Sequence, residues 1–170
     1  MKEIQKNNQY FIEYQKIRDE TLRFYRTFKE NYRNFMCQKG CTDCCESFSI
    51  LPVEFYWIRE MRRDENPINQ GKNSTKCKFL INGLCQIYNL RPIMCITQGL
   101  PLLIGGEEGQ SKEIIICRKN KNIIPKNRNN RYKLFEYDIL IGKMIVLNEL
   151  FCQEFRINTE RIDIEDIGFL

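Results

Sequence analysis

The sequence contains no histidine and no alanine, and only two of its 170 residues are valine. Without an imidazole, the chain cannot build a Ser-His-Asp or Cys-His catalytic site, a zinc finger that requires histidine, or a two-histidine, one-carboxylate iron site. Attachment of a c-type haem is excluded for the same reason. Any metal site must therefore be built from thiolates, with a carboxylate or an external ligand completing it.

Long hydrophobic runs are also missing from the sequence. No apolar run approaches the ~20 residues that are needed to cross a bilayer. The first residues, MKEIQKNNQYF, are polar and charged where a signal peptide would be apolar. Hydrophobic residues make up 42% of the chain and charged residues 29%, a balance typical of a soluble globular protein. We therefore predict a cytoplasmic protein that does not associate with membranes.

Cysteine, in contrast, is abundant, with nine residues. A reducing cytosol disfavours a disulfide framework, and an odd number leaves one thiol unpaired. Four of the thiols follow the pattern Cys37-x3-Cys41-x2-Cys44-Cys45. A loop this short can supply several ligands to one centre without long-range closure entropy, and thiolate selects zinc, Cu(I) or an iron–sulphur cluster. These four cysteines are the predicted cofactor-binding residues.

The spacing also predicts the directions in which the side chains of Cys44 and Cys45 point. Adjacent residues project in different directions, so Cys44 and Cys45 should not bind one ion as equals. One of them should face Cys37 and Cys41, and the other should face thiols further along the chain. A further cysteine, Cys152, lies in an apolar helical segment, and we interpret it as a buried core residue.

The polar and apolar segments predict a single α+β domain over residues 1–170, rich in helix. Its predicted parts are an N-terminal helix (1–36), a cysteine-cluster metal-binding core (37–117), a basic loop (118–132) and a C-terminal helix (133–156). Apolar residues recur at steps of three and four in the first helix, so we assign its aromatic stripe to the core. The last helix is apolar nearly all round, which predicts burial. We expect the two long helices to pack together, with a small cysteine-rich β-hairpin region holding the metal site.

Shorter signals subdivide the core. Pro52 suits the first turn of a helix that reaches about Arg63, and residues 64–76 read as a polar loop. Asn82-Gly83 between two apolar runs predicts a β-hairpin, because both turn positions need positive φ. In that hairpin Cys85 lies opposite Leu80. Cys77 would then lie about 10 Å further along its strand, so it can share a site with Cys85 only if the hairpin curls or Cys77 precedes it.

Further short helices and strands are predicted in the second half of the cysteine-cluster core. A helical turn is expected from Arg91-Pro92, and short strands are expected at 102–104 and 113–117. The basic segment that follows carries seven cations and no acid over residues 118–133, and we interpret it first as a solvated loop.

The cysteine pattern, together with Cys77-Lys78-Phe79-Leu80, Gly83-Leu84-Cys85-Gln86-Ile87-Tyr88, Arg91-Pro92 and Cys95, resembles the YkgJ-type cysteine-cluster family. That family is described as a zinc- or iron-chelating domain, and the resemblance covers about residues 37–117. It implies eight metal-ligand candidates: Cys37, Cys41, Cys44, Cys45, Cys77, Cys85, Cys95 and Cys117. Cys152 lies outside the pattern. The same domain occurs in flagellin lysine methylases, but this chain lacks a Gly-rich nucleotide-binding fingerprint, so the methylase activity is not carried over.

Three functions stay open at this point. The first is a metal-binding protein that holds an iron–sulphur cluster, for which four thiolates suit [4Fe–4S], or zinc. The second is a cluster-dependent enzyme, although about 125 residues after the cluster are too few for a radical SAM barrel. The third is a zinc-stabilised module that contacts nucleic acid or protein, and the modest net charge of +5 argues against nucleic acid. The sequence identifies no protein partner.

Overall fold

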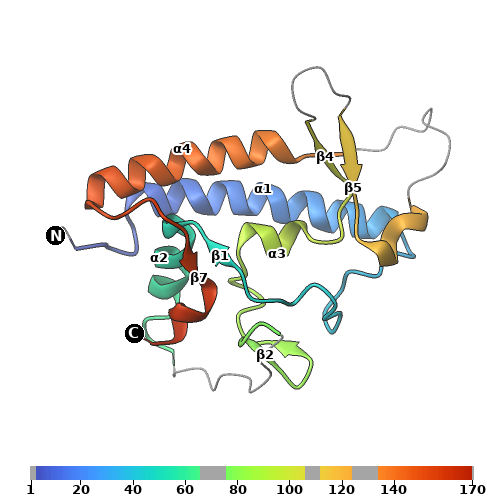
Figure 1. Ribbon diagram of the computed structural model, residues 1–170, viewed down its shortest axis with the longest axis horizontal. Helices are drawn as coiled ribbons and strands as arrows, with labels where there is room; N and C mark the ends of the chain where they lie inside the picture. Colours follow the sequence, from blue (N-terminus) through green and yellow to red (C-terminus); the bar gives the residue numbers. More distant parts are fainter. Residues whose placement is uncertain (1–2, 66–75, 106–111, 124–133, 170) are drawn as a thin grey trace.

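The computed structural model describes residues 3–65, 76–105, 112–123 and 134–169, which form a mixed helix and strand arrangement (Figure 1). The long helices α1 (Gln9–Asn31) and α4 (Tyr137–Phe155) lie side by side and run in opposite directions. Helix α2 (Pro52–Met61) packs against both of them, and the short α3 (Ile93–Thr97) packs against α1. None of the described helices combines the length and the apolar character that crossing a membrane requires.

Helix α1 is shorter at both ends than the predicted 1–36. The side chain of Asn8 accepts a hydrogen bond from the Phe11 N–H at 3.0 Å and caps the helix, so regular structure begins only at residue 9. At the other end Tyr32 leaves helical geometry (φ −122°, ψ 89°), and Phe35 folds back so that its ring lies 5.4 Å from that of Phe28. The apolar periodicity continues beyond the helix because these rings still pack onto it.

The aromatic stripe of α1 is a core feature, as predicted. Phe11 stacks on Phe151 of α4 with ring centroids 5.7 Å apart, and Tyr14 meets Trp57 of α2 edge-on at 5.1 Å. Phe11 and Tyr14 are buried, as are Tyr25 and Phe28 further along the helix. Burial of aromatic side chains on three helices makes this cluster the main apolar core.

Helix α4 differs from the prediction in its start and in its burial. It begins at Tyr137, because Phe135–Glu136 forms a strand (β6) instead, and it ends where Arg156 adopts a left-handed conformation (φ 56°). Only one face is covered by α1 and α2, so Ile139, Val146 and Leu150 are between 50% and 59% exposed. The prediction that an apolar helix is buried all round was therefore wrong, since α4 forms an outer layer of the fold.

The strands of the described residues are short and form three small sheets. The predicted hairpin is present as β2 (Leu80–Ile81) and β3 (Leu84–Cys85), with Asn82 at φ 50° and Gly83 at φ 76°. Strands β4 (Leu102–Ile104) and β5 (Glu113–Ile115) pair antiparallel, and β6 joins β4 in parallel. The pair β1 (Ser49–Ile50) and β7 (Ile162–Asp163) was not predicted, because two-residue strands far apart in sequence leave no periodic signal.

Two short 3₁₀ helices complete the described structure, η1 (Arg118–Ile123) and η2 (Ile164–Phe169). The predicted basic loop therefore starts as a helical segment, and its remainder from residue 124 lies outside the described residues. The same holds for residues 66–75, which make up most of the predicted polar loop.

A buried carboxylate joins the helices to the segment that carries Cys95. Glu54 of α2 is 5% exposed and accepts hydrogen bonds from the Tyr14 hydroxyl (3.1 Å) and from the Ile93 N–H at the start of α3 (2.9 Å). Burial raises the pKa of Glu54, and these hydrogen bonds oppose that shift. One side chain thus fixes α1, α2 and α3 relative to one another.

We predict that Glu54→Ala lowers the free energy of unfolding by on the order of 3 kcal/mol, because it leaves two buried donors without an acceptor. Urea denaturation followed by far-UV circular dichroism measures this. Glu13→Ala is the matched control, since Glu13 forms only an exposed pair with Lys16. Equal denaturation midpoints for the two variants would contradict the role given to Glu54.

Candidate metal centre

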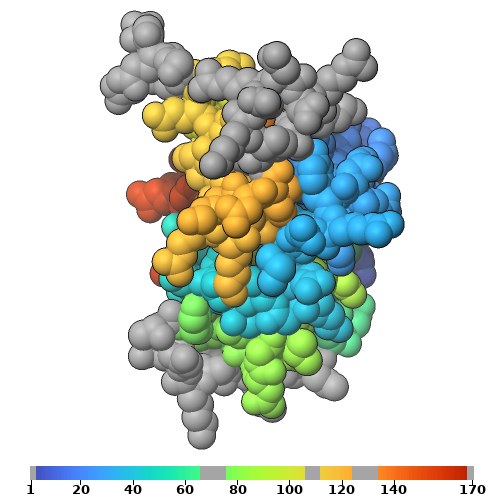
Figure 2. Space-filling model, turned by 90° about the vertical axis from the view of Figure 1, so that its right-hand side faces the viewer, coloured from blue at the N-terminus to red at the C-terminus, as the bar shows by residue number. Residues whose placement is uncertain are grey.

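Seven of the predicted cysteines surround one cavity of about 220 Å³. The cavity lies between the cluster loop, which we define as residues 37–45, the β2–β3 hairpin and helix α3. Figure 2 shows the cluster loop at the surface, between η1 above it and the hairpin below it. The thiols that line the cavity are those of Cys37, Cys41, Cys44, Cys45, Cys77, Cys85 and Cys95.

The thiols fall into two overlapping groups according to which other thiols act on them electrostatically. The electrostatic neighbours of Cys37 are Cys44 and Cys41, whereas those of Cys45 are Cys85, Cys95 and Cys77. The two adjacent cysteines thus differ in part of their surroundings, although the Cys44 thiol also donates a hydrogen bond to Cys45. The groups are not fully separate, because Cys44 also acts on Cys95.

Cys77 reaches this cavity because it precedes the hairpin. Residues 77–80 form a turn in which the Leu80 N–H donates to the Cys77 carbonyl at 2.9 Å, so Cys77 lies outside the extended strand. The Cys77 N–H donates to the Cys45 carbonyl at 3.1 Å and ties the hairpin segment to the cluster loop. Of the two routes that the sequence leaves open for Cys77 and Cys85 to meet, the structure uses the second.

Residues from distant segments hold the start of the cluster loop. The Tyr25 hydroxyl of α1 donates to the Cys37 carbonyl at 2.5 Å. The fully buried Asn120 accepts from the Met36 N–H at 2.8 Å and donates to the Gly99 carbonyl at 3.0 Å. Neither role is predicted from the sequence, because Tyr25 belongs to a core stripe and Asn120 is one asparagine in a basic, asparagine-rich segment.

Burial and mutual proximity keep most of these thiols protonated at neutral pH. Burial raises the pKa of Cys37 to about 11, with Cys44 and Cys41 adding to the effect, and burial likewise raises the pKa of Cys95. Cys45 is the exception, because a hydrogen bond from the Cys44 thiol stabilises its thiolate and lowers its pKa. Since only thiolates ligate metals, binding at this cavity must release protons.

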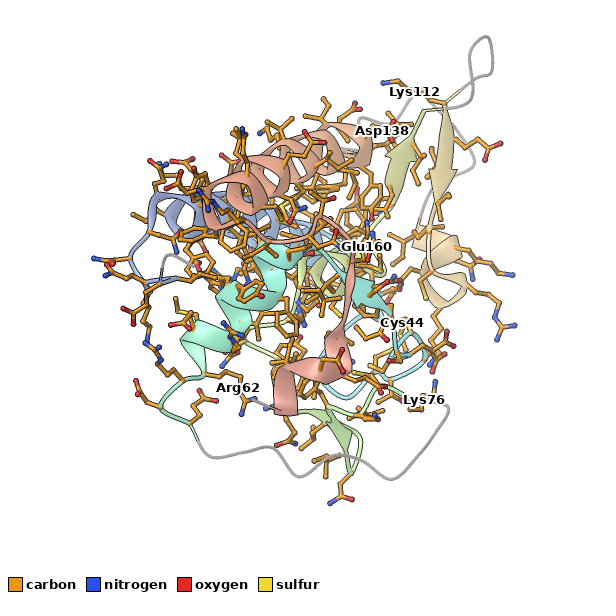
Figure 3. The ribbon with its side chains drawn as sticks, turned by 60° about the vertical axis from the view of Figure 1, so that its left-hand side comes forward. Cys44, Arg62, Lys76, Lys112, Asp138 and Glu160 are labelled. Atoms are coloured by element: carbon orange, nitrogen blue, oxygen red, sulfur yellow. The ribbon has the colours of Figure 1, made fainter. Side chains whose placement is uncertain are left out.

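Two cysteines lie elsewhere. Cys152 is 1% exposed inside the α4 core, which confirms its interpretation as a packing residue. Cys117 does not line the cavity. It lies near Lys119, whose ammonium pairs with the Asp43 carboxylate of the cluster loop at 2.8 Å. Figure 3 shows Cys44 on the same side of the molecule as Lys76, which donates to the Asp43 carbonyl at 3.2 Å. Lysine contacts therefore border the exposed part of the loop.

The chemistry of the donors fits a metal centre. Thiolates on the cluster loop, the hairpin segment and α3 are the soft ligands that zinc and iron–sulphur clusters require. Among the described residues, however, no three His, Cys, Asp or Glu side chains converge in a metal-ligating arrangement, so the thiols line the wall instead of meeting at one point. The cavity is also larger than one ion needs, since a water molecule occupies roughly 30 Å³.

The comparison with protein families agrees with this site. Residues 36–113 match the family model of the CxxCxxCC domain, which is described as a putative zinc- or iron-chelating domain. This segment of the chain therefore matches the model of the cysteine-cluster family that the motifs resemble. Neither the curated proteins nor the solved structures gave a match to the chain.

Gly99 provides a test of how tightly Cys37 is held. It has φ +89°, and a Cβ built there would lie 2.5 Å from the Cys37 Cβ and 3.0 Å from its Sγ. We predict that Gly99→Ala lowers the free energy of unfolding by about 2–4 kcal/mol, through left-handed strain and steric overlap together, and weakens metal binding. Chemical denaturation and metal analysis of the purified variant measure the two effects.

The variant Gly83→Ala distinguishes the effect of left-handed backbone strain from that of steric overlap with Cys37. Gly83 also has positive φ (+76°), but a Cβ there would meet no atom within 4 Å. Its alanine variant should lose only the roughly 1–2 kcal/mol of backbone strain and keep its metal. If both variants behaved alike, contact between Gly99 and Cys37 would not matter to the site.

Proposed function

We propose that this chain is a metal-binding protein whose cysteine thiolates hold an iron–sulphur cluster, with [4Fe–4S] as the form that four thiolates suit. The observation that carries the proposal is a cavity of about 220 Å³ walled by seven thiols. A volume of this size favours a centre of several atoms over a single ion. The match to a zinc- or iron-chelating family supports metal binding in general.

The electrostatic influence of the thiols on one another indicates which of them are the principal metal ligands. Cys45, Cys77, Cys85 and Cys95 influence one another directly, and they come from the cluster loop, the hairpin segment and α3. We propose these four as the principal ligands. Cys37, Cys41 and Cys44 form the second group, and they are available to the same centre because they also line the cavity. Cys117, the eighth candidate, is not part of this ligand set.

The setting of the cavity supports a redox role for the cluster. Apolar side chains share its wall with the thiols, among them Leu80, Ile87 and Met94. An apolar shell and partial exposure are the features with which a protein sets the potential of a cluster. Cys44 is exposed, so a centre in this cavity lies near the surface, where electrons can be exchanged with another molecule.

Zinc is the second candidate. The family description includes it, and thiolates suit it equally well by ligand type. A structural zinc site would use four thiolates in a closed tetrahedron with Zn–S distances of about 2.3 Å. That requires the cavity to contract around one ion, and the remaining thiols would then stay free.

Anaerobic purification followed by iron, sulphide and zinc analysis distinguishes the candidates. We expect iron with matching acid-labile sulphide and a broad absorption band near ~400 nm. Colourless protein with stoichiometric zinc would overturn the cluster in favour of the second candidate. A chain that bound neither metal would reject metal binding altogether.

Cysteine-to-serine variants test the ligand set. We expect Cys95→Ser to lose more than half of the bound metal and to unfold less cooperatively, because site formation and folding are coupled. Cys152→Ser is the matched control, since that thiol is buried in the core and does not line the cavity, so the variant should keep its metal while losing some core stability.

The variant Cys117→Ser tests the eighth metal-ligand candidate. Because Cys117 does not line the cavity, this variant should retain the metal content of the parent protein. Metal loss in Cys117→Ser, or full retention in Cys95→Ser, would show that the proposed ligand set is wrong.

A further inference from the structure

Arg91 is a buried cation beside the cavity that pairs with no carboxylate among the described residues. Its side chain lines the cavity, the residue is 8% exposed, and its Nε is buried without a hydrogen-bond partner. Two aromatic rings enclose the guanidinium, whose carbon lies 4.0 Å from the centroid of Tyr88 and 5.3 Å from that of Tyr25. Cation–π contacts stabilise it in part, but they do not neutralise its charge.

A buried charge without a counter-ion is costly, so a partner of opposite charge is expected nearby. Seven thiols share the cavity wall with Arg91, together with one carboxylate, Glu46, which forms no ion pair with Arg91, and the exposed Lys39. The charge of Arg91 acts on the thiols of Cys37, Cys85 and Cys95. Neutral thiols cannot balance a guanidinium. Four thiolates around one zinc ion carry a net charge of about −2, and thiolate-ligated clusters are likewise anionic.

The other cations near the site have different surroundings. Lys119 and Lys78 form ion pairs with Asp43 and Glu165 at 2.8 and 2.6 Å, and Lys76 donates to backbone carbonyls of the cluster loop. Among the described residues, Arg91 is thus the enclosed cation of the cavity wall that has no acidic partner.

We propose that Arg91 is the built-in counter-charge of the metal centre, a positioning residue that favours an anionic thiolate assembly in this cavity. This inference rests on the proposed metal-binding function. Because the guanidinium is held by Tyr25, whose hydroxyl also binds the Cys37 carbonyl, the charge and the start of the cluster loop are fixed by the same side chain.

The proposal predicts effects of opposite sign on the metal-free and the metal-bound protein. Arg91→Met should leave the chelator-treated protein as stable as the parent or more stable, since it removes an unbalanced buried charge. The same change should weaken Zn²⁺ binding at least tenfold, as measured by competition with a chromogenic chelator. If the protein carries a cluster, its midpoint potential should fall, and a tenfold effect corresponds to about 59 mV for one electron.

Arg91→Lys and Arg18→Met are the matched variants. Lysine keeps the charge and should restore most of the Zn²⁺ affinity and of the potential, and this comparison stays informative if Arg91→Met does not fold. Arg18 is also buried, lies 5.0 Å from the Trp57 ring centroid and donates to the Asn89 carbonyl, but it does not line the cavity. Arg18→Met should therefore lower stability and leave metal affinity unchanged.

The outcomes separate this inference from the proposed function. If the parent protein binds metal but Arg91→Met lowers only the stability of the metal-free form, Arg91 is a packing residue and the inference is wrong. Equal losses of affinity in Arg91→Met and Arg91→Lys would also overturn it, because charge would then not be the determining property. If the parent chain binds neither zinc nor iron, the proposed function fails and the inference fails with it.

Discussion

The cluster loop has little apolar surface of its own, so hydrogen bonds from other parts of the chain must hold it. Polar residues separate its thiols, and the loop contributes no buried side chain to the main core. Three of the contacts that position it are those of the Tyr25 hydroxyl with the Cys37 carbonyl, of Asn120 with the Met36 N–H, and of the Cys77 N–H with the Cys45 carbonyl. Each contact reaches a different part of the fold. The helices, the hairpin and η1 must therefore all be in place before the thiols face one cavity.

This dependence explains why the helical layer matters to a site that it does not line. Glu54 links α1 and α2 to the first residue of α3, and α3 carries Met94 and Cys95 into the cavity wall. The hydrogen bonds are buried, so they act in a medium of low dielectric constant where an unpaired group is costly. A displacement of the helices would consequently be transmitted to the thiols through a short, fully satisfied network.

Local chemistry made part of this structure predictable. Pro52 at the start of α2 and Asn82-Gly83 in the hairpin specify their conformations through their own backbone preferences, and both predictions were confirmed. The helix ends were less predictable, because the apolar period continues through Phe35 although the backbone leaves the helix at Tyr32. The exposure of α4 depends on how many other helices and strands pack against it, and the composition of α4 does not specify that number. The motif identified the thiols, but the roles of Asn120 and Arg91 follow only from contacts between distant segments.

The wide separation of the thiols in sequence has a further consequence for the unfolded chain. The cavity brings together cysteines from position 37 to position 95, so any centre bonded to both ends closes a loop of nearly sixty residues. By the chain-entropy relation for cross-links, closing such a loop removes unfolded conformations worth about 4 kcal/mol. The nine cysteines form no disulfide, so a bound centre would supply the kind of restraint on the unfolded chain that small secreted proteins obtain from disulfide bonds.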